Sequence, residues 1–182
     1  MTPVFLNTPH LCLRPIDWTV DDIHRYRAWL SDATVTRYLA TGIFPVSEAA
    51  LRAYVAKFQD STTDMLLAIV VRDTQQHIGN VTLQHIDWVA RMGETGLLIG
   101  EPSAWGQGYA TEVWRALARY AFERLGLQRL WAGVVSENEA SLRALQKVGF
   151  QVEGRLRRHH FIGGVWLDDI RVGLLREEFI QE

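Results

Sequence analysis

The stretch GEPSAWGQGYATE, Gly100–Glu112, joins an apolar segment typical of a strand to an amphipathic helical segment through a loop that carries two glycines. The first N–H groups of a helix have no partner within the helix, and the helix dipole places partial positive charge at that end. Gly106 and Gly108 lack the Cβ atom that would keep an anion away from the backbone. The junction therefore predicts an anion site, suited to a pyrophosphate, built from backbone N–H groups.

Two other phosphate-binding loops fit this stretch less well. A Walker A loop ends in Gly-Lys-Ser/Thr, and the loop here contains no lysine. The dinucleotide loop G-x-G-x-x-G requires a third glycine where Thr111 stands. A glycine loop that only turns the chain remains an alternative when the Gly-x-Gly motif is considered alone.

Strands and helices are predicted on both sides of the loop. Apolar patterning predicts strands near residues 10–14, 64–72, 77–87, 93–100, 129–135, 150–156 and 165–175. Apolar residues at helical spacing predict helices from residues 23, 47, 110 and 138, the first after a capping box at Thr19 and Asp22, the second starting at Ser47. Gly163-Gly164 predicts a two-residue hairpin turn. This order predicts an α/β fold with a mixed sheet rather than a regularly alternating doubly wound fold, in a single domain of residues 1–182.

Composition narrows the class of protein. A formal net charge of -2 provides no overall basic field for nucleic acid. No apolar run approaches the roughly 20 residues that span a bilayer, so we expect a cytoplasmic protein without membrane contact. The one cysteine, Cys12, excludes an internal disulfide framework, and no residue spacing is typical of a metal site.

Two motifs resemble those of GNAT superfamily N-acetyltransferases. Gly106–Glu112 resembles the pyrophosphate loop for acetyl-CoA, and Asn138–Phe150 resembles the second cofactor motif, with an asparagine, a small residue three positions on, and Lys-x-Gly-Phe. Leu13–Pro15, Glu153–Arg155 and Asp168-Asp169 look like the branch that contains ribosomal-protein N-terminal and polyamine acetyltransferases. The resemblance covers nearly the whole chain from about residue 10. It implies a central, mostly antiparallel sheet of about seven strands with a splayed parallel pair, flanked by about four helices.

The resemblance also implies where acetyl-CoA binds. The pantetheine arm is expected beside Leu98, Ile99 and Gly100, with the N–H of Leu98 near the thioester carbonyl. Asn138 is the expected side-chain partner of pantetheine, or a plain helix N-cap with Ser141 at the third helical position. The loop residues expected at the cofactor are Gly106, Gln107, Gly108, Tyr109, Ala110 and Thr111. Trp105 stands where many members carry Gln or Arg.

Catalysis needs a proton acceptor, because a protonated amine cannot attack a thioester. Glu94, at the start of the fourth predicted strand, is the candidate general base or else a solvated glutamate, with Asp87 in reserve. Many members carry a tyrosine as general acid where this chain has Leu145. Ser141 is the next candidate to protonate the thiolate, unless its role is only in the helix cap and water serves instead.

Together these features predict an N-acetyltransferase that moves an acetyl group from acetyl-CoA to a primary amine by direct attack in a ternary complex. The acceptor classes implied by the resemblance are protein N-termini, polyamines, amino sugars and antibiotic amines. We expect the acceptor under residues 33–44 and the terminal hairpin, and a homodimer is possible. The alternative is a non-catalytic acyl-CoA-binding regulatory module.

Overall fold

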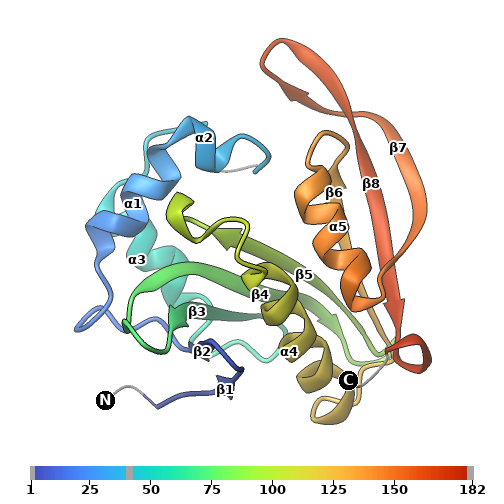
Figure 1. Ribbon diagram of the computed structural model, residues 1–182, viewed down its shortest axis with the longest axis horizontal. Helices are drawn as coiled ribbons and strands as arrows, with labels where there is room; N and C mark the ends of the chain where they lie inside the picture. The colour runs from blue at the N-terminus through green and yellow to red at the C-terminus, as the bar shows by residue number, and fades with distance from the viewer. Residues whose placement is uncertain (1–2, 40–42, 180–182) are drawn as a thin grey trace.

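A computed structural model describes residues 3–39 and 43–179 of the chain, and its centre is one mixed sheet with strand order β1-β2-β3-β4-β5-β6-β8-β7 (Figure 1). The strands are β1 (Leu6–Asn7), β2 (Leu11–Arg14), β3 (Met65–Val71), β4 (His77–Asp87), β5 (Met92–Ile99), β6 (Arg129–Val135), β7 (Gln151–Ile162) and β8 (Val165–Leu175). The α-helices are α1 (Ile23–Ser31), α2 (Ala33–Thr36), α3 (Glu48–Ala56), α4 (Tyr109–Glu123) and α5 (Glu139–Val148). This confirms the predicted α/β mixed sheet.

The two elements that sequence patterning missed are short. β1 has two residues and α2 has four, too few for a periodic apolar pattern. The described chain therefore has eight strands and five α-helices where about seven and about four were expected. β7 is also longer than predicted and continues to Ile162, with a register irregularity between Leu156 and His160.

Strands β2 and β3 are buried on both faces because their residues alternate between two apolar cores. Leu67 and Ile69 of β3 belong to the core under α4 and α5, while Leu66 and Ala68 belong to the core under α1 and α3. In Figure 1, α1, α2 and α3 lie together on one side of β3–β5, and α4 and α5 lie near β5 and β6. Each face of the central strands is thereby closed to water except where cavities open, as described below.

The parallel pair β5–β6 splays apart. Residues 92–94 of β5 pair with residues 129–131 of β6, and the pairing ends there, whereas β4 stays paired with β5 as far as Ile99. β6 is meanwhile held by β8 along its whole length, from Arg129 to Val135. The second half of β5 therefore keeps one paired edge and presents the other edge to the gap between the strands, which confirms the expected splay.

Helix ends follow the predicted residues with one correction. Ser47 caps α3 by accepting the N–H of Ala50 at 3.1 Å, and the hairpin glycines Gly163 and Gly164 have φ of 59° and 83°. The capping box expected at Thr19 is wrong, because the Asp22 side chain itself caps α1 through the N–H of His24 at 2.8 Å. Asp22 immediately precedes the first helical residue, so its short side chain reaches that N–H directly.

A buried ion pair ties β2 to the segment before α1. The guanidinium of Arg14 donates to both carboxylate oxygens of Asp21 at 2.7 and 2.6 Å, and the two side chains are 8% and 1% exposed. Asp21 also accepts the N–H of Asp17 at 2.7 Å, and the Nδ1 atom of His77 lies 3.6 Å from it. Hydrogen bonding to Asp21 raises the pKa of Arg14, while burial lowers the pKa of His77. An unpaired charge is costly in such an interior, so each of the two side chains needs the other as its partner.

Replacing Arg14 with Met should lower the free energy of unfolding by about 3 kcal/mol, because the Asp21 carboxylate would remain buried without its counter-ion. Urea denaturation of the ligand-free protein measures the loss. Adding Asp21→Asn should recover part of it. Arg143→Met, which breaks the exposed pair with Glu139, should cost less than about 0.5 kcal/mol. Equal losses at the two arginines would contradict the role of burial.

Candidate functional site

A cleft opens where β5 and β6 diverge. The cavity has a volume of about 560 Å³ and is bounded by residues from four places: residues 97–99 of β5, the glycine loop with the start of α4, α5, and residues 34–39. We call it the β5–α5 cleft. The segment 34–39 was expected near the acceptor, and residues 40–42 of that expected region lie outside the described residues. The terminal hairpin supplies none of the described residues that line this cleft.

The glycine loop leaves room for a ligand at its backbone. Gly106 and Gly108 have φ of 74° and 82°, a left-handed conformation that side chains with a Cβ rarely adopt. A Cβ built on either residue would meet no protein atom within 4 Å. Gly108 is the N-cap residue of α4 and offers no side chain to the first helical N–H groups. These N–H groups are therefore available to an anion in the cleft, as the loop sequence predicts.

Charged side chains in the cleft are all cationic. Arg37, Arg143 and Lys147 line it, and no Asp or Glu is among its described lining residues. Arg143 and Lys147 are four residues apart and therefore share one face of α5. These three cations were not among the cofactor residues expected from the sequence, although the helical spacing of two of them was a usable signal.

A buried donor in the cleft has no partner in the protein. Trp114 is 4% exposed and lines the cleft, and its indole Nε1–H makes no hydrogen bond with the described residues. Buried polar groups are nearly always satisfied, so such a donor indicates a ligand acceptor at this place. Together with the open glycine loop and the three cations, it fits a large polyanionic ligand such as coenzyme A.

The sheet ladder determines which N–H groups of β5 face the cleft. Asn80 pairs with Leu98, and the N–H of Gly100 donates to the carbonyl of Ile78 at 2.9 Å, so the even-numbered N–H groups here point to β4. The N–H groups of Leu97 and Ile99 point the other way. The N–H of Leu98, which was expected at the thioester carbonyl, is therefore directed at β4, and the N–H of Leu97 faces the cleft.

Trp105 fastens the loop to the end of β5. Its indole Nε1–H donates to the carbonyl of Ile99 at 2.8 Å, and its ring lines the cleft. Ile99 thus has one of its two cleft-facing backbone groups occupied from within the protein. The N–H and the carbonyl of Leu97 also face the cleft. Leu97 lies beyond the residues of β5 that pair with β6.

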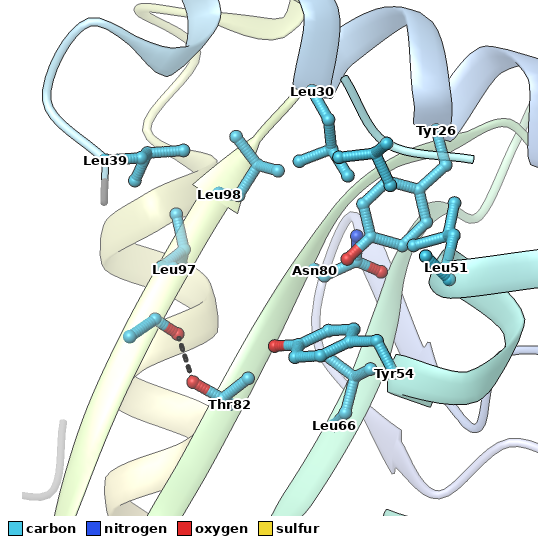
Figure 2. Close-up of a pocket in the computed structure, with 13 residues that line it drawn as sticks. Tyr26, Leu30, Leu39, Leu51, Tyr54, Leu66, Asn80, Thr82, Leu97 and Leu98 are labelled. Atoms are coloured by element: carbon cyan, nitrogen blue, oxygen red, sulfur yellow. Dashed lines mark hydrogen bonds between the residues drawn. The ribbon is translucent and has the colours of Figure 1, made fainter. Parts of the chain in front are cut away.

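A second cavity lies on the opposite side of β5, under α1 and α3 (Figure 2). It has a volume of about 370 Å³ and shares Leu39, Leu97 and Leu98 with the β5–α5 cleft. We call it the α1–α3 pocket. Burial raises the pKa of the hydroxyls of Tyr26 and Tyr54, so both stay protonated and uncharged. The pocket and the cleft meet at the splayed part of β5.

Most predicted cofactor residues lie at the cleft, and two do not. Leu98, Ile99, Gly106, Gly108, Tyr109, Ala110, Thr111 and Asn138 line it. Gln107 is absent from the lining. Gly100 is also absent, since its N–H is bound to β4 and a Cβ there would lie 2.1 Å from the ring of Trp29, so packing accounts for this glycine.

The candidate acid Ser141 lies in the cleft, whereas Leu145, one helical turn further along α5, does not. Ser141 lines the cleft, and its backbone N–H donates to Oδ1 of Asn138 at 3.3 Å, so Asn138 is the N-cap of α5. The cap uses the backbone of Ser141 and leaves the hydroxyl out of it. Leu145 is fully buried in the core under α4 and α5 and is not among the residues that line the cleft.

The candidate base lies beside the α1–α3 pocket rather than in its wall. Glu94 shares a sheet face with Gly96 and Leu98, which line the pocket, and its carboxylate lies 2.8 Å from Nδ1 of His85. Asp87, the reserve, accepts the N–H groups of Val89 and Ala90 at 2.8 Å each. Asp87 therefore closes the β4–β5 turn, which is a structural role.

No three His, Cys, Asp or Glu side chains in residues 3–39 and 43–179 are grouped so that they could hold a metal ion. In the same part of the chain, no helix has the length and apolar character needed to cross a membrane.

Comparison with known proteins agrees with this geometry. Residues 10–151 match the family described as Acetyltransferase (GNAT) domain. The uncharacterized N-acetyltransferase YoaA of Bacillus subtilis is 35% identical over 171 residues, 92% of this chain and 94% of its own. Spermidine N(1)-acetyltransferase of Escherichia coli is 33% identical over 113 residues, 62% of this chain and 60% of its own. Spermidine N-acetyltransferase from Vibrio cholerae, crystallised with CoA and spermine, has the same fold, with a TM-score of 0.84 and 22% identity over 94% of this chain and 99% of that one.

Replacing Gly108 with Val should weaken binding of coenzyme A by about tenfold or more, which corresponds to about 1.4 kcal/mol. The added side chain would occupy the space that the loop leaves open for the pyrophosphate, and the left-handed φ would be strained. Calorimetry with CoA measures the change. Gly163→Val is the matched control, because Gly163 also has a positive φ with open space around it and lines neither cavity. An unchanged affinity in Gly108→Val would remove the loop from the cofactor site.

Proposed function

This chain belongs to the GNAT acetyltransferase family and is an acetyl-CoA-dependent N-acetyltransferase, and on that premise we propose that it acetylates a primary amine by direct attack while both substrates are bound. One observation carries the proposal. The β5–α5 cleft and the α1–α3 pocket meet at Leu97 and Leu98, so a thioester in the cleft and an amine in the pocket would face each other there. The residues that line the cleft and the pocket come from both halves of the chain. This supports a single domain of residues 1–182.

Acetyl-CoA fits the cleft in a definite direction. The pyrophosphate would bind the N–H groups of the loop from Gly106 to Thr111, and Arg37, Arg143 and Lys147 would neutralise the phosphates. The pantetheine arm would extend from the loop along Leu97 and Ile99, toward the opening that the cleft shares with the pocket. This direction places the acetyl group at the end of the cleft nearest the pocket.

The acceptor class proposed is a small amine. Relatives in Escherichia coli and Vibrio cholerae are named for spermidine, and the α1–α3 pocket of about 370 Å³ has the size of a small-molecule site. The pocket is bounded by Leu39 and Val46 at the ends of the segment between α2 and α3. The terminal hairpin, which was also expected near the acceptor, contributes no described residue to the pocket wall.

Bond making and proton transfer can be assigned to residues of this chain. The amine nitrogen attacks the thioester carbonyl carbon, the C–N bond forms, and the C–S bond breaks with its electron pair passing to sulfur. The N–H of Leu97 would stabilise the charge that develops on the carbonyl oxygen. The amine proton would pass to Glu94, and the thiolate would take a proton from Ser141 or water. Leu97 is three residues from Glu94, roughly 10 Å along the strand, so that proton must travel through water.

Replacing Glu94 with Gln should lower kcat/KM for amine acetylation by roughly 10²–10⁴ near pH 7, because the amide keeps the size of the side chain and removes its basicity. The loss should shrink as the pH rises, since more of the amine then arrives already deprotonated. CoA release from acetyl-CoA, measured against a panel of primary amines between pH 6 and 10, gives both results.

Asp87→Asn is the matched control for Glu94→Gln. It removes a carboxylate from the neighbouring strand but keeps the oxygen that closes the turn, so kcat/KM should stay at the wild-type value. A Glu94→Gln enzyme with the wild-type pH–rate profile would defeat the assignment of the base. A wild-type chain that binds acetyl-CoA and releases no CoA with any amine would instead be a non-catalytic acyl-CoA-binding regulatory module.

Replacing Ser141 with Ala should lower kcat more than it changes the affinity for acetyl-CoA, if the hydroxyl protonates the departing thiolate. Because the helix cap uses the backbone N–H of Ser141, the thermal midpoint should not change with the substitution. Stopped-flow measurement of thiol release, with calorimetry for affinity, separates the two quantities. Full activity in the alanine variant would assign the proton to water.

A further inference from the structure

We propose that the acceptor is a primary monoamine with an uncharged, largely apolar body and one hydrogen-bond-accepting oxygen, which binds the buried amide of Asn80. The inference rests on the proposed function and specifies the substrate class of the α1–α3 pocket. It distinguishes this chain from the relatives named for spermidine, whose substrate carries several amines.

The wall of the α1–α3 pocket is uncharged. None of its described lining residues is Asp, Glu, Lys or Arg, and its apolar side chains come from all sides of the cavity: Leu30, Leu39, Val46, Leu51, Leu66 and Leu98. Its polar groups are neutral, because the hydroxyls of Tyr26 and Tyr54 stay protonated. Such a wall favours an apolar body that leaves water.

A polyamine does not suit this wall. After one amine reacts, its remaining ammonium groups would lie in the pocket without a carboxylate beside them, and burying an unpaired charge is costly. Glu94 lies beside the pocket, on the sheet face of Gly96 and Leu98. Its carboxylate provides one negative charge, and that charge is assigned to the reacting amine.

Asn80 provides the specific polar contact. It is 4% exposed, lines the pocket, and has no hydrogen-bond partner for its Nδ2 atom among the described residues. Figure 2 shows Asn80 on β4 in the part of the pocket where Tyr26 and Tyr54 also project. A buried NH₂ group without an acceptor is costly, so a ligand oxygen at this place would be strongly selected.

The orientation of that amide follows from its neighbour. Nε2 of His77 lies 2.9 Å from the carbonyl of Gly79, which can only accept, so Nε2 carries a hydrogen. The same Nε2 lies 3.0 Å from the Asn80 side chain, which must therefore present its oxygen to His77. The Asn80 Nδ2 atom is the end left for the pocket.

A matched set of amines tests the substrate class. We expect 2-(4-methoxyphenyl)ethylamine to give a kcat/KM at least about 100-fold above that of spermidine, because several kcal/mol separate a buried apolar body from buried charges. It should exceed its isostere 2-(4-ethylphenyl)ethylamine by roughly tenfold, the value of one hydrogen bond. Spermidine acetylated as efficiently as the methoxy compound would overturn the substrate class and leave the proposed function standing. No CoA release with these three compounds or with any other amine of the panel, although CoA binds, would overturn the proposed function itself.

Asn80→Asp tests the residue. The aspartate keeps an oxygen for His77, removes the two donor hydrogens and adds a charge. The methoxy-to-ethyl ratio should fall from roughly tenfold to one or below, and the ratio of spermidine to methoxy compound should rise by roughly tenfold. A methoxy-to-ethyl ratio that stays at the wild-type value would overturn the role of Asn80. Unchanged CoA affinity and thermal midpoint verify the fold.

A second variant keeps the test decisive if Asn80→Asp unfolds. Tyr54 is 39% exposed at the edge of the pocket, where a carboxylate stays partly solvated. Tyr54→Glu should raise the spermidine-to-monoamine ratio by roughly fivefold or more, while the uncharged Tyr54→Gln should not. Equal ratios in the two variants would show that charge in the pocket does not select the acceptor, and would overturn the inference.

Discussion

The candidate functional site depends on the point at which β5 and β6 stop pairing, which is Glu94 of β5. A strand edge without a neighbouring strand presents N–H and carbonyl groups that must be satisfied by something else. Here Trp105 satisfies the carbonyl of Ile99, and Leu97 remains directed at the cleft. The same divergence creates the cavity that a long cofactor can occupy, so one interruption of the sheet provides both the space and the hydrogen-bonding groups.

The two cavities that meet at β5 differ in electrostatic character, since one is cationic and the other is neutral. The β5–α5 cleft combines a helix N-terminus with three cationic side chains and suits phosphates. The α1–α3 pocket is neutral and apolar and suits an uncharged body. This difference gives each substrate a preferred side of the strand, which is a requirement for direct transfer between two molecules bound at the same time.

A buried polar network supports the neutral pocket from behind. Arg14 binds Asp21, the carboxylate of Asp21 lies 3.6 Å from Nδ1 of His77, and Nε2 of His77 binds the oxygen of Asn80. The network extends from Arg14 on β2 to Asn80 in the pocket wall. It holds the Asn80 oxygen toward His77 and leaves the NH₂ group directed at the pocket. Within this network, the Nδ2 atom of Asn80 is the buried side-chain atom that has no partner among the described residues.

The sequence by itself determined the elements whose signal is local. The glycine loop, the Asn138 cap and the Gly163-Gly164 turn depend on neighbours in the chain, and the structure has all three where the pattern predicted them. Which β5 amide faces the cleft depends on the register with β4, so Leu97 rather than Leu98 could be identified only from the sheet.

The wall of the α1–α3 pocket, and the position of Arg37 in the cleft, depend on tertiary structure that the sequence pattern does not show. Tyr26, Tyr54 and Asn80 come from two helices and a strand that are distant in the sequence, and nothing local indicates that they share a cavity. The same holds for Arg37, which only folding brings to the cations of α5. Periodicity shows that a residue faces inward, but whether it meets core or cavity depends on how the elements above the sheet pack, and that packing is a property of the whole fold.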